Sequence, residues 1–213
     1  MRGWLGKLAL VAIVGLVVGW TVGPAAAAPK WLLFGDAMFV KEGQGDNPWA
    51  LQLRSDPTIP PTFGGVRFTP PGEPMVFTDL WSLGTDYDVT DDDCGGGSPR
   101  FQVRMDMDGD GMGDANVFVY IGPFPNFSGC AGGWQSTGNL IGATDARYDL
   151  TQVGGTFYDT YGNAVALVGG KTVTRVSLVV DAGWAFADGE QTILVDNVTV
   201  NDHVLSGHGA AGS

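Results

Sequence analysis

The stretch DMDGDGMGD places four carboxylates within nine residues, an arrangement that can hold a hard metal ion. Asp106, Asp108 and Asp110 occupy alternate positions, and Asp114 follows after a Gly-rich turn. Calcium takes several oxygen ligands at about 2.3–2.6 Å, and carboxylates on alternate residues of a tight loop can converge on one ion. The backbone carbonyl of Met112 stands where such loops supply a further oxygen. The sequence therefore predicts a calcium site formed by these five residues.

This loop resembles the first nine positions of an EF-hand calcium loop, and also the Asp-rich calcium loops of dockerins and thrombospondin type 3 repeats. Gly111 falls at the sixth position, where the EF-hand loop turns sharply. The twelfth position is Val117 instead of the bidentate Glu, and the flanking residues alternate as strands do. The resemblance therefore implies a structural ion, not a regulatory switch. The alternative is an ordinary hairpin loop, because Asp and Gly both favour turns.

Cys94 and Cys130 are the two cysteines of the chain. An even count in an exported chain favours a disulfide bond. Closing this loop of 36 residues is worth roughly 4 kcal/mol on the chain-entropy estimate. The acidic run Asp91–Asp93 directly precedes Cys94, so we expect the disulfide to hold it near the Asp loop. There it would add metal ligands or form a solvated turn.

The sequence offers little for catalysis. The two histidines, His203 and His208, both lie near the C-terminus, whereas a catalytic triad or a zinc site needs imidazoles held beside their partners. We therefore expect no catalytic residues and no enzymatic activity. A glycoside hydrolase with paired carboxylates is the remaining enzymatic alternative. Three glutamates are available for it: Glu42, Glu73 and Glu190.

Several aromatic residues are candidates for ligand binding. Trp134 lies in a Gly-rich loop, and Tyr158 and Tyr161 flank the start of a predicted helix. Exposed aromatic rings provide flat apolar surfaces on which sugar rings pack. We predict these three residues as a ligand site, with packing inside the protein as the alternative. Polar side chains beside Trp134 either bind sugar hydroxyls or belong to an ordinary polar loop: Gln135, Ser136, Thr137 and Asn139. Other tryptophans are predicted to face the core or a sheet: Trp31, Trp49, Trp81 and Trp184.

The first 27 residues have the features of a cleaved secretory signal peptide. Arg2 and Lys7 form a positive region, residues 8–18 are apolar, and Ala25–Ala27 supply small residues for cleavage before Ala28. The apolar run is shorter than the ~20 residues of a spanning helix. We therefore predict a secreted, extracellular protein with no stable membrane insertion after cleavage. Residues 28–201 would form a single domain, and residues 202–213 a flexible tail.

The charge of the chain argues against nucleic acid as a partner. The full sequence has 11 basic and 23 acidic residues, a formal net charge of −12. Loss of Arg2 and Lys7 with the signal peptide would leave nine basic residues against 23 acidic ones, a net charge of −14. Binding to phosphate needs a basic surface. The same composition disfavours an anionic membrane surface.

The sequence predicts an all-β protein. Its 34 Gly and 12 Pro residues separate roughly eight to ten short alternating segments, which predict a two-sheet antiparallel β-sandwich with one short helix. Thr172–Val180 and Gln191–Val200 are the clearest strands, and Asp159–Val168 is the helix, with Asp159 as its N-cap. Trp31–Val40 is predicted as one strand kinked at Gly35, Thr137–Ile141 as a short strand and Gly95–Gly97 as a flexible hinge.

The last third of the chain carries a family resemblance. The segments VSLVVDAGW and DGEQTILVDNVTVN resemble the closing strands of secreted bacterial jelly-roll domains of the carbohydrate-binding-module type. In those domains the final strand commonly carries an Asp-Asn or Asp-Asp pair, here Asp196-Asn197. The resemblance implies a jelly-roll-like sandwich and makes Asp196 a second, weaker calcium ligand. It transfers no sugar-binding residue.

These observations together predict a secreted, non-catalytic, calcium-stabilised β-sandwich that binds a polysaccharide, a cell-surface glycan or another extracellular surface. A structural cell-surface or matrix protein without a small ligand is the first alternative. The carboxylate-based glycoside hydrolase is the second.

Overall fold

Two long strands rich in β-branched residues lie at the centre of the structure, one in each of two sheets. The computed structural model describes residues 30–130 and 132–207. In chain order its strands are β1 (Lys30–Gly35), β2 (Ala37–Val40), β3 (Ala50–Ser55), β4 (Gly64–Thr69), β5 (Leu83–Asp91), β6 (Arg100–Asp106), β7 (Ala115–Tyr120), β8 (Gln135–Ser136), β9 (Tyr148–Asp149), β10 (Thr172–Val180), β11 (Gln191–Val200) and β12 (His203–Leu205). The central strands β10 and β11 have the bounds that the sequence predicted.

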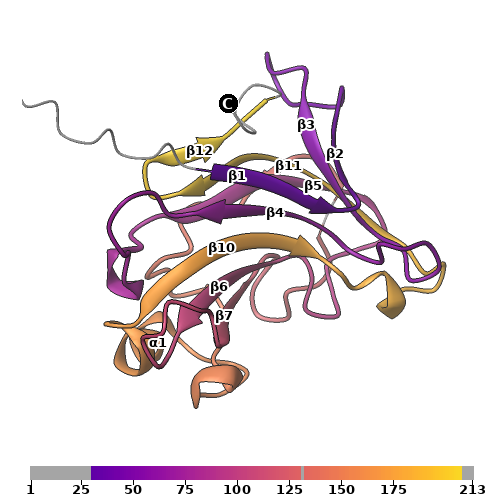
Figure 1. Ribbon diagram of the computed structural model, residues 1–213. Helices are drawn as coiled ribbons and strands as arrows, with labels where there is room; N and C mark the ends of the chain where they lie inside the picture. The colour runs from indigo at the N-terminus through magenta and orange to yellow at the C-terminus, as the bar shows by residue number, and fades with distance from the viewer. Residues whose placement is uncertain (1–29, 131, 208–213) are drawn as a thin grey trace, which may run out of the picture.

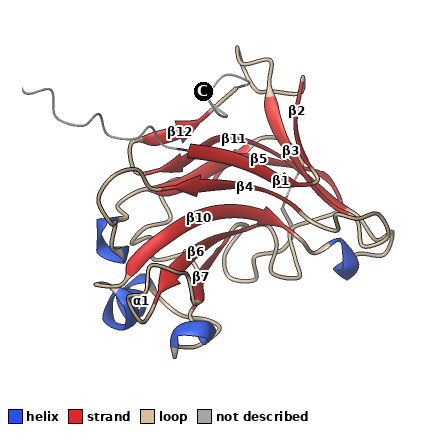
Figure 2. Cartoon of the chain, in the orientation of Figure 1, coloured by secondary structure: helices blue, strands red, loops and turns tan. Residues whose placement is uncertain are grey.

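The strands form two antiparallel sheets of six strands each. Figure 1 shows how the labelled strands are arranged. The first sheet has the order β1-β4-β10-β6-β7-β9. The second has the order β2-β3-β11-β5-β8, with β12 paired to β11. Helical segments are few and lie at the edges of the sandwich (Figure 2): α1 (Tyr161–Val168) and the 3-10 turns η1 (Phe77–Asp79), η2 (Thr151–Val153) and η3 (Gly183–Ala185). The predicted all-β sandwich with one short helix is confirmed.

The chain crosses from the first sheet to the second at Gly35. Strand β1 pairs with β4, whereas β2 pairs with β3, so the strand predicted over Trp31–Val40 is two strands in different sheets. Gly35 has a φ of +66°, and a Cβ atom there would clash with the carbonyl oxygen of Phe63. The kink predicted at this glycine is therefore a sheet-to-sheet crossing that no larger residue would allow.

Side chains alternate along β6 between the core and the outer face. Phe101, Val103 and Met105 are fully buried, while Gln102 and Arg104 are half-buried. Successive residues of a strand point to opposite faces, so this alternation sets the register in which β6 pairs with β7 and β10. The register brings the end of β6 beside the start of β10, which places the Asp loop at one end of the sandwich.

Two predicted boundaries near the C-terminal half are wrong. The helix begins at Tyr161, and its N-cap is Thr160, whose hydroxyl accepts a hydrogen bond from the Asn163 amide at 3.3 Å. Strand β12 lies inside the predicted flexible tail, because Leu205 is buried in the core and β12 pairs with β11. Residues 208–213 of that tail, and the predicted signal peptide, lie outside the described residues.

Two further local predictions, a flexible hinge and a short strand, are also wrong. Gly95–Gly97 is an ordered turn instead of a flexible hinge, because Gly95 and Ser98 exchange two backbone hydrogen bonds at 2.8 and 2.9 Å. The positive φ angles of Gly96 and Gly97 are those of a two-residue hairpin turn. The short strand expected over Thr137–Ile141 is instead β8, just before it.

The predicted burial of the tryptophans is confirmed only in part. Trp31 is buried and Trp49 is half-buried, whereas Trp81 and Trp184 are 54% and 68% exposed. Trp81 follows η1 and Trp184 lies within η3, so both stand on turns outside the sheets. Among the described residues, no helix has the length and apolarity to cross a bilayer.

Candidate functional site

The Asp loop joins β6 to β7, and its backbone folds around Asp106. This side chain is only 4% exposed and accepts hydrogen bonds from the amides of Gly109 and Gly111 at 2.6 and 2.9 Å. The hydrogen bond from Gly109 is the largest cause that lowers the pKa of Asp106. Asp108 and Asp114 also accept backbone hydrogen bonds within the loop, at 3.1 and 2.7 Å. The loop therefore keeps the carboxylate of Asp106 ionised.

Three of the four predicted carboxylates converge. Carboxylate oxygens of Asp106, Asp108 and Asp114 lie within 4.8 Å of one another. Oxygens that bind one calcium ion at about 2.3–2.6 Å are at most about 5 Å apart, so this set fits the ion. Asp110 is not in the group; it accepts a hydrogen bond from the amide of Met112 at 2.7 Å. The Met112 side chain is exposed, as expected if only its carbonyl were a ligand.

Cationic side chains reach the loop but contact only its backbone. Lys171 donates to the carbonyl oxygen of Met107 at 2.7 Å, and Arg104 donates to the carbonyl oxygen of Gly113. Among the described residues, neither forms a salt bridge with a carboxylate of the loop. Within the described chain, the aspartates of the loop are therefore not paired with a cationic side chain.

The predicted disulfide between Cys94 and Cys130 is present, with a Cα–Cα distance of 5.6 Å. Asp93 accepts hydrogen bonds from the amides of both cysteines, at 2.7 and 2.6 Å, and so holds the two ends of the bridge. Cys94 precedes β6 and Cys130 follows β7, whereas the Asp loop joins the opposite ends of these two strands. The seven residues of β6 separate the two by about 20 Å. The expectation that the disulfide brings Asp91–Asp93 near the Asp loop is therefore wrong.

The rest of the acidic run forms a second cluster. Oxygens of Asp91, Asp92 and Asp188 lie within 4.8 Å of one another on the surface. A hydrogen bond with Asp188 raises the pKa of Asp92 to about 6, and the same contact lowers the pKa of Asp188. The two carboxylates therefore share a proton below about pH 6.

Asp196, the weaker metal candidate, belongs to a hydrogen-bonded network. It is 4% exposed and accepts from the side-chain amide of Asn47 and from the backbone amide of Asn197, both at 2.8 Å. Within the described residues it joins neither convergent aspartate group. Its two oxygens are each used by one neighbour, which explains how a carboxylate is held at this buried position.

The three predicted aromatic ligand residues do not form one site. Tyr161 packs against the core beside Phe77 and Tyr148, with ring centroids 6.0 and 5.9 Å away. Tyr158 is 60% exposed, and Trp134 is half-buried. Only Tyr158 therefore has the exposure expected of a ring that receives a ligand.

A cleft of about 230 Å³ lies instead beside the loop that follows β7. Its apolar walls include Tyr87, Tyr120, Phe124 and Phe127, and Phe124 is 65% exposed. Burial, followed by the charge of Asp149, raises the pKa of Tyr120 to about 12, so this tyrosine is neutral. Polar side chains line the rest of the cleft: Gln135, Ser136, Thr137 and Asp145.

The polar part of this cleft was predictable from the sequence, whereas its aromatic part was not predicted. Gln135, Ser136 and Thr137 were predicted beside Trp134, and they line the cleft although Trp134 does not. Phe124 and Phe127 lie in the Gly- and Pro-rich segment GPFPNFSGC, so the criterion that selected Trp134 would also have selected them.

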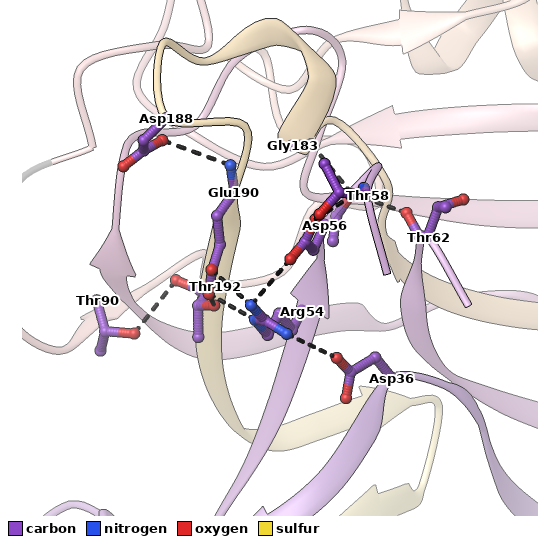
Figure 3. Close-up of polar contacts among 11 residues, drawn as sticks. Asp36, Arg54, Asp56, Thr58, Thr62, Thr90, Gly183, Asp188, Glu190 and Thr192 are labelled. Carbon is purple, nitrogen blue, oxygen red and sulfur yellow. Dashed lines mark hydrogen bonds and ion pairs between the residues drawn. The ribbon is translucent and has the colours of Figure 1, made fainter. Parts of the chain in front are cut away.

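Another polar network surrounds Arg54 at the end of β3 (Figure 3). Its guanidinium binds both carboxylate oxygens of Glu190 at 2.6 Å and reaches Asp56 and Asp36 at 3.1 and 3.5 Å. The hydrogen bond from Arg54 is the main cause that lowers the pKa of Glu190. Glu190 also accepts from the Thr192 hydroxyl at 2.9 Å. This carboxylate is therefore held ionised by a fixed cation.

Comparisons with protein families, with curated proteins and with solved structures returned no match for this chain.

Proposed function

We propose that the protein is an exported, non-catalytic β-sandwich that binds a glycan in the cleft beside β7 and takes up a structural calcium ion in the Asp loop. The observation that carries the binding function is the composition of the cleft. Aromatic rings line one part and hydroxyl, amide and carboxylate groups line another, and one ring, that of Phe124, is largely exposed. Sugars present apolar C–H faces and hydroxyl edges, so such a lining suits them.

The size of the cleft limits what it can receive. Its volume of about 230 Å³ is below the ~300–1,000 Å³ of sites that enclose drug-sized ligands. A single sugar ring, or the end of a chain, fits this space better than an extended oligosaccharide. We therefore propose recognition of one sugar residue within a larger glycan.

Calcium is supported by the convergence of Asp106, Asp108 and Asp114 without a paired cation in the described chain. The ion would offset the repulsion among these carboxylates and fasten the turn between β6 and β7. The role is structural because the loop joins two paired strands, β6 and β7, which leaves no helix pair to open.

The non-catalytic part of the proposal is supported by the state of the acidic residues. A glycosidase acid needs a raised pKa, whereas Arg54 lowers the pKa of Glu190. Asp92 has a raised pKa, but it shares its proton directly with Asp188. Hydrolases hold their two carboxyl groups about 5–10 Å apart to leave room for substrate or water. Asp92 and Asp188 are in direct hydrogen-bond contact, and Glu190 is paired with an arginine, so neither group has the arrangement of a hydrolase.

A glycan array, probed in the presence of calcium, tests the binding function. We expect binding to a subset of glycans, and we expect Phe124→Ala to weaken it at least tenfold. Phe63→Ala is the matched control, because Phe63 is also an exposed aromatic residue but lies away from the cleft. Absence of binding to any glycan would overturn the binding function and favour a structural surface protein.

Calorimetric titration of calcium into chelator-treated protein tests the ion. We expect one site with a dissociation constant of about 10⁻⁴–10⁻³ M, the range of extracellular modules. Absence of binding heat would contradict it. Export is tested by N-terminal sequencing of protein recovered outside the cells, which should begin at Ala28.

A further inference from the structure

Arg147 is a buried cation enclosed by aromatic rings. It is 7% exposed, and its guanidinium carbon lies 3.6 Å from the ring centroid of Tyr158 and 3.9 Å from that of Phe157. Tyr120 and Phe127 complete the enclosure at 4.5 and 5.7 Å. The rings cover the faces of the planar guanidinium, so only its edge remains for hydrogen bonds.

That edge is incompletely used. Nε of Arg147 donates to the carbonyl oxygen of Phe157 at 3.4 Å, but the buried Nη2 has no hydrogen-bond partner within residues 30–130 and 132–207. Among the described residues, Arg147 also has no salt bridge, in contrast to Arg54 and Arg100. A buried donor of a charged group without a partner is unfavourable, and an incoming acceptor would relieve it.

A second cavity, of about 280 Å³, adjoins this arginine. Tyr120, Phe127 and Phe157, three of the four rings around the guanidinium, line the cavity together with Arg147 itself. The guanidinium end of the side chain therefore lies at the cavity wall. The remaining lining includes Ser98, Asn126 and Ser128 and contains no acidic residue, although the chain has 23.

The two cavities are adjacent. Both are lined by Tyr120, Ile121 and Phe127, so the glycan cleft and the cavity beside Arg147 border the same residues. Phe157 and Tyr158 are 48% and 60% exposed, so the two rings nearest the guanidinium stand at the surface. Binding would require one of these rings to turn and expose Nη2, which is buried in this structure. The cleft and the cavity thus combine a neutral, hydroxyl-binding part with a cationic part.

We propose that this second cavity binds the carboxylate of an acidic sugar residue, with Nη2 of Arg147 as a donor to it. The inference rests on the proposed glycan function and specifies its ligand as a uronate-containing glycan. A carboxylate is planar and pairs with the edge of a guanidinium, whereas the rings stack on its faces. The exposed hydroxyl of Ser128 and the exposed side-chain amide of Asn126 would bind neighbouring sugar hydroxyls.

The test is an NMR titration of the calcium-loaded wild-type protein with D-glucuronate, its methyl ester, D-glucose and acetate. The four probes separate the charge from the sugar ring, and the comparison needs no variant. We expect glucuronate to bind at least tenfold more tightly than the ester, glucose or acetate, and to shift the amide signals of Gly96 and Gly97. Equal binding of glucuronate and its ester would overturn the proposal, as would equal binding of acetate.

Variants provide a second readout. Arg147→Gln should abolish the preference for glucuronate over its ester, while Arg147→Lys, which keeps the charge but loses the planar edge, should reduce it. Retention of the full preference in Arg147→Gln would contradict the assignment. If neutral sugars bind and glucuronate binds no more tightly than they do, the carboxylate site at Arg147 is wrong but the proposed glycan binding stands. If no glycan binds at all, the proposed function fails with it.

Discussion

The acidic residues at the two ends of the sandwich differ in what neutralises them. At the end where β10 finishes, one guanidinium, that of Arg54, binds Glu190, Asp56 and Asp36. At the end where β10 begins, the aspartates of the Asp loop have only backbone amides as partners within the described chain. Thr172 of β10 pairs with Asp106 and Val180 pairs with Gly64, next to Arg54, so about 25 Å separates the two ends.

This difference shows why acidity alone does not mark an ion site. Carboxylates around Arg54 already have a fixed positive partner, so an added cation gains little there. Carboxylates of the Asp loop converge with no such partner, and a divalent ion would be their only strong source of neutralisation. We therefore expect calcium to bind in the Asp loop, whereas Arg54 neutralises the carboxylates of its own network.

Removing the disulfide should have the largest effect on stability. The double substitution Cys94→Ala, Cys130→Ala opens a loop of 36 residues and should lower the free energy of unfolding by about 4 kcal/mol. Urea denaturation measures this loss. Because the bridge lies at the Arg54 end, the calcium-induced rise in melting temperature should persist in the variant. Its disappearance would mean that the two ends are coupled.

Removing the guanidinium of Arg54 should have the second-largest effect on stability. Arg54→Met leaves three carboxylates facing one another and should cost about 2 kcal/mol, since hydrogen bonds between charged groups are involved. Arg67→Met is the matched control, because Arg67 is half-buried on β4 and forms no salt bridge among the described residues. Equal losses in both variants, measured in urea, would show that the network around Arg54 contributes nothing beyond packing.

Two conservative substitutions within the Asp loop separate ligands from turn formers. Asp108 and Asp110 each accept a hydrogen bond from an amide two residues ahead, at 3.1 and 2.7 Å, and asparagine preserves both turns. Asp108→Asn should weaken calcium binding about tenfold, or about 1.4 kcal/mol, because Asp108 belongs to the convergent group. Asp110→Asn should weaken calcium binding less, because Asp110 lies outside that group. Calorimetric titration compares them, and the reverse order would contradict the assignment of ligands.

The smallest effect concerns the shared proton of Asp92 and Asp188. The pKa of Asp92 is raised to about 6, so the stability that its proton contributes is present below about pH 4 and is lost as the pH rises through about 6. The lowered pKa of Asp188 contributes stability that is present above about pH 4 and is lost as the pH falls. Asp92→Asn keeps a hydrogen-bond donor at all pH values. It should raise the melting temperature by about 1 °C at pH 7.5 but not at pH 5.

Chelator in both buffers excludes calcium from this comparison, and Asp46→Asn, an exposed carboxylate on another loop, serves as the control. An equal shift at both pH values would show that the pair shares no proton.

The fold was predictable from the sequence where one residue pattern decided the structure. β10 and β11 are uninterrupted β-branched runs, and their bounds were predicted correctly. β8 has two residues at a sheet edge, too few for a pattern, and Trp184 is exposed because it stands on a turn that only the tertiary structure defines.

The candidate sites also differ in whether a local sequence pattern could predict them. Asp106, Asp108 and Asp114 are neighbours in the chain, so their spacing alone brings them together. Arg54 and Glu190 are 136 residues apart, and the rings around Arg147 come from separate loops and from β7. No local pattern predicts such contacts, because the pairing of the sheets creates them.

Thermal melting with calcium and with a chelator tests the central claim most directly. At 100 times the dissociation constant, calcium should add about 2.7 kcal/mol and raise the melting temperature by about 5 °C or more. Magnesium at the same concentration should do less, because it needs a tighter octahedral shell. Equal melting temperatures with calcium and with chelator would contradict the claim and make the Asp loop an ordinary turn.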